Sequence, residues 1–108
     1  MIWNVDYADS AKQDLREIYQ YVSYVLLEPA IAAKQTDRIM DAADSLDNMP
    51  MRHRLYDKEP WRSMGLRVLP VDNWVVLYVP DEAKRIVKII RVIYGGRDID
   101  AQLEQTEL

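Results

Sequence analysis

The stretch RVLPVDNWVVLYVPDEAKRIVKIIRVIYGGRD, residues 67–98, decides the fold of this chain. Three runs rich in β-branched and aromatic residues follow one another within it, separated by short turns: 67–71, 74–79 and 86–94. This pattern predicts an antiparallel meander of three strands. The middle run is apolar almost throughout, as expected of a central strand that is covered on both faces. Pro70 cannot donate a ladder hydrogen bond, so the first run either ends there or lies at a sheet edge.

Upstream of the meander, the sequence predicts a short strand over residues 2–7 and then two amphipathic helices, one from about residue 8 and one over 30–48. The expected buried stripes are Ala11, Leu15, Ile18, Val22 and Val25 in the first helix, and Ile31, Ile39, Ala42, Leu46 and Met49 in the second. Either Ser10 with Gln13 or Asp9 alone could cap the first helix. Pro29 separates the two helices, and the short break implies an antiparallel pair.

The predicted element order β-α-α-β-β-β defines an α+β fold, with the helix pair packed on one face of a small twisted antiparallel sheet. We expect a single domain over residues 1–108 and a short last helix over 98–104. The opposite face of the sheet is expected to be partly open, with Arg85 and Arg91 pointing from it in the same direction. Trp3 and Trp61 are expected to pack in the core.

Charge is distributed unevenly along the chain, whose net charge is −4. Residues 1–51 hold four basic and nine acidic side chains, 52–97 hold ten basic and five acidic, and 98–108 hold four acids and no base. A basic second half on an acidic chain indicates a surface for an anionic partner, or lysines and arginines that keep a sheet in solution.

Several classes of protein are excluded by composition. The chain has no cysteine, which excludes disulfides and thiolate metal sites and is consistent with a cytoplasmic location. We expect no membrane partner, because no apolar run reaches the roughly 18 residues of a membrane span and no signal peptide is recognisable. Asp37, Asp41 and Asp44 share a helix face, but nothing nearby completes a ligand set, so we predict no metal.

Two segments carry a resemblance to a known family: residues 65–78, GLRVLPVDNWVVLY, and residues 89–98, IIRVIYGGRD. They resemble the RelE/ParE superfamily, the toxins of bacterial type II toxin–antitoxin modules, also described as a plasmid stabilisation family. The resemblance implies one RelE/ParE-like domain that inhibits bacterial growth and has no cofactor. It also implies a cognate antitoxin that wraps the toxin with a helix and an extended segment.

The superfamily has two different activities, and the resemblance leaves both open. RelE-like members cut messenger RNA in the ribosomal A site without a metal, whereas ParE-like members inhibit DNA gyrase. The target is therefore gyrase or the ribosome with its message. A third possibility is a non-toxic relative that only binds its antitoxin. The ending RVIYGGRDI, residues 91–99, is closer to the ParE-like pattern.

Candidate site residues depend on which activity the chain has. A nuclease would draw its catalytic groups from His53, Arg67, Tyr94 and Arg97, of which the two arginines match family positions. Val75 stands where many RelE-like proteins have an arginine, and no tyrosine follows Arg97, which favours the ParE-like branch. Further binding candidates are Arg52, Arg54, Arg62, Arg85 and Arg91. Arg97 could instead be structural and pair with acids at the strand end.

Overall fold

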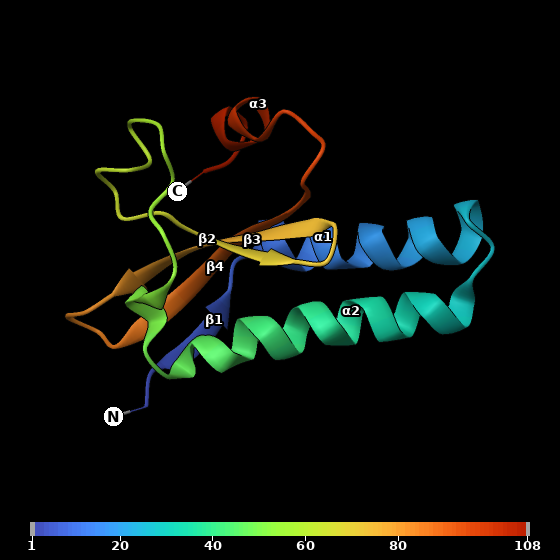
Figure 1. Cartoon of the computed structure of the whole chain (residues 1–108), viewed down its shortest axis with the longest axis horizontal. Helices are drawn as coiled ribbons and strands as arrows, with labels where there is room; N and C mark the ends of the chain where they lie inside the picture. The colour runs from blue at the N-terminus through green and yellow to red at the C-terminus, as the bar shows by residue number, and fades with distance from the viewer. Residues whose placement is uncertain (1, 108) are drawn as a thin grey trace.

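A four-stranded sheet forms the centre of the structure, a computed structural model that describes residues 2–107 (Figure 1). The strands are β1 (Asn4–Tyr7), β2 (Arg67–Val71), β3 (Trp74–Asp81) and β4 (Ile86–Tyr94), arranged in the order β1-β4-β3-β2. The pairs β2–β3 and β3–β4 are antiparallel, which confirms the predicted meander. Pro70 lies in β2 at the edge of the sheet, where its missing N–H costs no ladder bond.

The first strand departs from the prediction, because β1 runs parallel to β4 rather than antiparallel to a neighbour. Its pairing extends from Asn4 opposite Ile86 to Tyr7 opposite Ile89. A hairpin turn forces two strands to be antiparallel, but β1 is separated from the meander by the helix pair and reaches its partner through a crossover. The sheet is therefore mixed, and the prediction of a wholly antiparallel sheet was wrong at β1.

Two helices, α1 (Asp9–Gln20) and α2 (Pro29–Asp44), pack side by side on one face of the sheet (Figure 1). A π-helical turn, Tyr21–Val25, continues α1. The core between the layers is formed by buried residues of both helices and of three strands: Ala11, Ile18, Ile39, Ala43, Leu69, Val76, Tyr78, Val87, Ile89 and Val92. Neither predicted cap is used at α1, since Ser10 Oγ donates instead to the carbonyl of Ile90 at 2.7 Å.

Three residues predicted on the buried stripes are exposed: Val25, Ile31 and Met49. Val25 and Ile31 remain 65% and 51% exposed and lie at the end of the helix pair where the two helices are joined. This joined end of the helix pair projects past the sheet (Figure 1). We call residues 21–31 the hairpin end. Met49 follows α2 in a left-handed conformation that turns it outward. Leu27 in the hairpin end also has a left-handed backbone, with φ +56°, which costs a residue with a Cβ about 1–2 kcal/mol.

The second face of the sheet is covered, which corrects the prediction of a partly open face. Trp61, Leu66 and Leu103 form a second core cluster there with residues of all three meander strands. Leu103 comes from α3 (Ile99–Glu104), which starts where Asp98 accepts a hydrogen bond from the N–H of Ala101, as the predicted last helix requires. Trp3 and Trp61 are both buried, as expected. None of the helices within residues 2–107 has the length and apolar character that crossing a bilayer would demand.

Candidate functional site

A groove of about 960 Å³ lies between the helical hairpin, the ends of β3 and β4, and the segment that contains α3. Nine of the residues that line it are apolar or aromatic, and eight are polar or charged. The residues that line it are Asp14, Glu17, Ile18, Tyr21, Val22, Leu26, Ile31, Gln35, Asn73, Trp74, Arg91, Val92, Ile93, Tyr94, Arg97, Gln102 and Gln105.

The groove exists because β1 is short. β1 pairs with β4 only as far as Ile89, so the last residues of β4 have no strand beside them on that edge within the described chain. The helices continue past this point and overhang the uncovered edge. Trp74 and Tyr94, paired across β3 and β4, meet edge to face at 5.5 Å between ring centroids and form an aromatic wall. Tyr94 remains 46% exposed, so part of this wall is available to a partner.

A buried ion pair between Arg91 and Asp14 forms part of the groove. Arg91 Nε lies 2.6 Å from Asp14 Oδ2 and Nη2 lies 2.9 Å from Oδ1, with side-chain exposures of 15% and 8%. Asp14 Oδ2 also accepts the N–H of Val92 at 2.8 Å, which satisfies the edge of β4 where β1 has ended. The remaining nitrogen of Arg91 donates to the carbonyl of Gln102 and to Thr106 Oγ1. This arginine therefore ties α1, β4 and the C-terminal segment together.

Arg91 was predicted to bind an external partner. In the structure its guanidinium instead contacts Asp14 and the C-terminal segment of the same chain. Asp14 was not predicted to have a role, although the sequence carries the signal. It falls on the same helix face as Ala11 and Ile18, where a charged residue requires a buried partner.

Arg97 lies at the groove and is exposed. Its backbone N–H donates to the carbonyl of Tyr94 in the turn that follows β4. Its side chain makes no hydrogen bond or ion pair with any residue from 2 to 107, so the acid partner considered for it does not occur there. The adjacent acid, Asp98, instead caps α3. Arg97 is thus a cation available to an incoming acidic group.

His53 and Arg67 lie together at the start of β2. Arg67 Nη1 donates to the backbone carbonyl of His53 at 2.6 Å and to that of Met51 at 3.1 Å. The His53 ring lies edge-on to Tyr78, and its Nε2 is buried without a hydrogen-bond partner in the described chain. Burial and the charge of Arg52 lower the pKa of His53, so the imidazole is neutral at pH 7.

The hydroxyl of Tyr78 is also engaged in a hydrogen bond within the protein. Its hydroxyl donates to the carbonyl of Pro50 at 2.6 Å, and burial raises its pKa to about 12. A tyrosine in this condition holds a loop in place and does not exchange protons at neutral pH.

The four residues predicted for a nuclease form two separate pairs. Arg67 is paired in register with Tyr78, whereas Trp74, four residues away on β3, is paired with Tyr94. Four residues of strand span about 13 Å, so the pair His53–Arg67 and the pair Tyr94–Arg97 lie toward opposite ends of the meander.

The other basic candidates are dispersed. Arg52 donates to backbone carbonyls just before it in the chain, and Arg54 forms an exposed ion pair with an acid three residues on. Arg62 is exposed on the segment before β2. Arg85 sits in the β3–β4 turn with its guanidinium 5.2 Å from the ring centroid of Trp3. They therefore do not converge on one site with the groove residues.

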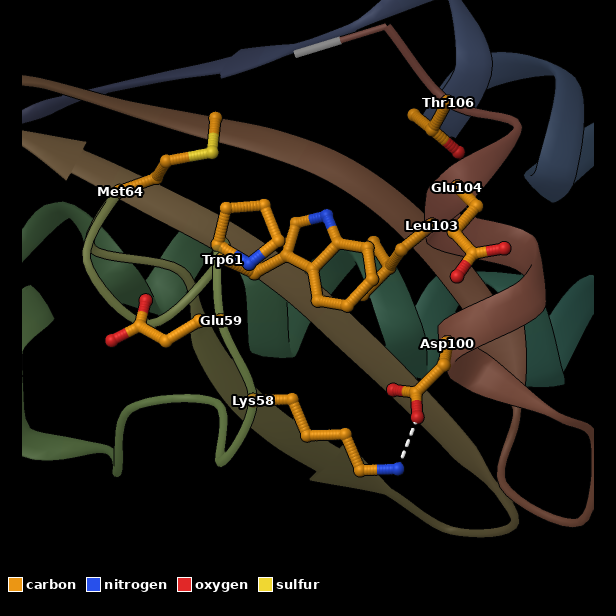
Figure 2. Close-up of a pocket in the computed structure, with 9 residues that line it drawn as sticks. Lys58, Glu59, Trp61, Met64, Asp100, Leu103, Glu104 and Thr106 are labelled. Carbon is orange, nitrogen blue, oxygen red and sulfur yellow. Dashed lines mark hydrogen bonds and ion pairs between the residues drawn. The ribbon is translucent and has the colours of Figure 1, made fainter.

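A second, more open pocket of about 520 Å³ lies between the segment before β2 and α3. Figure 2 shows Trp61 at its centre, with Lys58 directed toward Asp100. The hydroxyl of Tyr56 also donates to Asp100. Burial and this carboxylate raise the pKa of Tyr56, and the bond from Lys58 lowers the pKa of Asp100. These contacts fasten α3 over the second face of the sheet.

The three acids Asp37, Asp41 and Asp44 remain on the exposed side of α2, where Asp44 accepts a hydrogen bond from the hydroxyl of Tyr7 at 2.8 Å. Within residues 2–107, no group of three histidine, cysteine or carboxylate side chains is arranged to hold a metal ion.

Solved structures with the same arrangement define the fold as that of RelE/ParE toxins. The chromosomal ParDE toxin–antitoxin system from P. aeruginosa matches with a TM-score of 0.70 and 20% identity, covering 86% of this chain and 96% of that one. The RelBE2 toxin–antitoxin complex from Mycobacterium tuberculosis matches with a TM-score of 0.62 and 22% identity, covering 87% and 99%. A mutant of the E. coli toxin RelE in the free state matches with a TM-score of 0.67 and 10% identity, covering 98% and 94%.

The family is given by a sequence comparison. Residues 5–99 match the model of the ParE toxin of the type II toxin–antitoxin system, parDE. The chain belongs to this family of toxins. No curated protein sequence matches it.

Proposed function

We propose that the chain stops bacterial growth by binding DNA gyrase without cutting RNA, and that a cognate antitoxin neutralises it. Membership of the ParE toxin family supports the gyrase target, since ParE-like members of the superfamily inhibit that enzyme. The observation that supports the absence of RNA cleavage is the separation of His53 and Arg67 from Tyr94 and Arg97. In this proposal residues 1–108 act as one cytoplasmic domain.

Cutting RNA at a 2′-hydroxyl without a metal needs a base, an acid and cations around one phosphate. Here the available groups are divided between two ends of the meander, about 13 Å apart along the strands. Arg67 donates to backbone carbonyls rather than facing a ligand. Val75, at the position where many RelE-like proteins carry an arginine, packs against the second core cluster. These positions support a toxin that acts by binding.

The groove is the site that we propose for the antitoxin. Its apolar and aromatic walls, with Ile18, Leu26 and Trp74 among them, suit the apolar side of an amphipathic helix or of an extended segment. Arg97 at the groove would then meet an acidic side chain of the antitoxin. The ParDE and RelBE2 structures are themselves toxin–antitoxin assemblies, which supports a partner of this kind.

The target is tested with purified gyrase and purified ribosomes in parallel. We expect the chain to block supercoiling of relaxed plasmid by gyrase and to leave ribosome-bound message intact in a primer-extension assay. Addition of the antitoxin should restore supercoiling. Cleavage in the ribosomal A site, lost in the His53→Ala variant, would establish the nuclease instead. Absence of any growth arrest on induction would favour a non-toxic relative that only binds its antitoxin.

The antitoxin site is tested by reversing the charge of Arg97. We expect Arg97→Glu to weaken antitoxin binding roughly tenfold in isothermal titration calorimetry, the effect of losing about 1.4 kcal/mol. Arg62→Glu is the matched control, because Arg62 is also exposed but does not line the groove. Equal weakening by both substitutions would show that general charge, and not the groove, governs the interaction.

A further inference from the structure

We propose that two copies of this chain associate through the hairpin end, residues 21–31. This surface shares Tyr21, Leu26 and Ile31 with the groove and extends beyond it to Tyr24, Val25 and Leu27, so self-association and antitoxin binding would compete for the shared residues. The inference does not depend on whether the target is gyrase. It concerns a part of the helices that has no sheet beneath it, as the projecting ends of α1 and α2 show in Figure 1.

The hairpin end exposes large apolar side chains to an unusual extent. The six that contribute most are Tyr21 (49% exposed), Tyr24 (74%), Val25 (65%), Leu26 (52%), Leu27 (77%) and Ile31 (51%). Scattered apolar residues are normal on a protein surface, but six exposed large apolar side chains within eleven consecutive residues are a concentration that indicates an interaction site.

The backbone conformation of the hairpin end also supports an interaction site. Leu27 combines a left-handed backbone with the highest exposure of these six, a position where glycine or asparagine would be less strained. The preceding residues form a π-helical turn, a feature often found at functional sites. Ser23 within that turn has a buried hydroxyl without a hydrogen-bond partner in the described chain. Strain of this kind persists where a local geometry serves a purpose other than the stability of the monomer.

The scarcity of charged residues in the hairpin end favours a second copy of this chain as the partner. Glu28 is the only acidic or basic residue between 18 and 33, in a chain of net charge −4. Each copy therefore brings one charged side chain, Glu28, to this surface, and two copies can meet there with little like-charge repulsion if the two Glu28 side chains stay at the rim of the contact. A nucleic acid is disfavoured because the segment offers no lysine or arginine to a phosphate.

The available area is sufficient for a small symmetric interface. An aromatic side chain such as Tyr21 or Tyr24 buries at least about 150 Å² when it is completely covered. With a similar area for the four aliphatic side chains, complete coverage of the exposed parts of all six supplies at most roughly 500 Å² per copy. A specific interface needs at least about 1,000 Å² in total, which two copies related by a twofold axis provide. The same patch then faces itself, and the two hairpins form a contact of four helical segments.

Sedimentation velocity of the full chain tests this directly. We expect cell-free synthesised protein to form a dimer of twice the 12.7 kDa chain mass as its concentration rises through the micromolar range. The double variant Tyr24→Ser/Leu27→Asn should raise the dimer dissociation constant at least about tenfold, since two apolar side chains leave the contact. Asparagine accepts the left-handed backbone at position 27, so this variant should remain folded, as circular dichroism will verify.

Met64→Ser is the matched control, because Met64 is 45% exposed but lies outside the hairpin end. It should dimerise like the unmodified chain. A chain that stays monomeric up to hundred-micromolar concentrations, or a folded double variant that dimerises as tightly as the unmodified chain, would overturn the proposal. Loss of antitoxin binding by the double variant, with the unmodified chain monomeric, would assign the surface to the antitoxin and also overturn it.

Discussion

The Asp14–Arg91 ion pair holds together the elements that form the groove, so replacing Asp14 should lower the free energy of unfolding of the domain. Asp14→Ala removes both contacts to the guanidinium and the acceptor for the N–H of Val92. Arg91 is only 15% exposed and would be left as a charge without an acidic partner. Removing one member of a buried ion pair typically costs about 3–5 kcal/mol of stability.

That loss is large for a chain of this length. Domains of this size are stable by about 5–15 kcal/mol, so Asp14→Ala should remove roughly a fifth or more of the free energy of unfolding. The entropy of unfolding is roughly 0.23 kcal/mol/K for a chain of 108 residues, which converts the loss to a fall in Tm of about 13–22 °C. Urea denaturation followed by circular dichroism measures the free energy, and a thermal scan measures Tm.

Two further variants separate the ion pair from other effects. Asp37→Ala removes an exposed acid from α2 and should change stability by less than about 0.5 kcal/mol. Asp14→Leu combined with Arg91→Met should recover more than half of the loss, because the cost comes mainly from the unpaired charge. The reasoning is refuted if Asp14→Ala costs less than about 1 kcal/mol, or if the double variant is less stable than Asp14→Ala.

Three other predictions follow from individual residues. Leu27→Asn should stabilise the monomer by about 0.5–1 kcal/mol in urea denaturation, because it relieves the left-handed backbone, and a loss of stability would contradict that strain. Leu103→Ala should cost about 2–5 kcal/mol, since it empties the second core cluster, whereas Glu104→Ala should cost little. The pKa of His53 is lower folded than unfolded, so its contribution to stability is present above about pH 6.5 and is lost as pH falls toward the folded value. Urea titrations over this range should show a shallower decline for His53→Gln, and an equal decline would contradict the shift.

Much of the fold follows from local patterns. The period-two runs and their turns predict the meander, and Pro70 predicts an edge, because these features depend only on backbone chemistry. The direction of β1 could not be predicted, since it depends on how the crossover returns and not on any residue of β1. The covered second face was missed because residues 53–66 have no regular periodicity, although Trp61 and Leu66 are the apolar residues that cover it.

The site was predicted less well than the fold, for a physical reason. An arginine on a strand has the same appearance in the sequence whether it binds a partner or an internal acid. Arg91 proved to be internal because Asp14, 77 positions earlier, reaches it across the helix–sheet interface. Arg97 has no acidic partner among residues 2–107, so it does not form the structural ion pair that was considered for it within this part of the chain. The exposure of the hairpin end could not be predicted from the sequence, because its apolar residues continue the same helical spacing as the buried residues of the core.

The central claim is that this toxin acts on gyrase by binding and has no nuclease centre. Plasmid topology in growing bacteria tests it most directly, with the unmodified chain and the His53→Ala/Tyr94→Phe variant induced side by side. We predict that both arrest growth and both relax a reporter plasmid on chloroquine gels. An unchanged plasmid accompanied by cut messenger RNA, with toxicity lost in a folded double variant, would contradict the account.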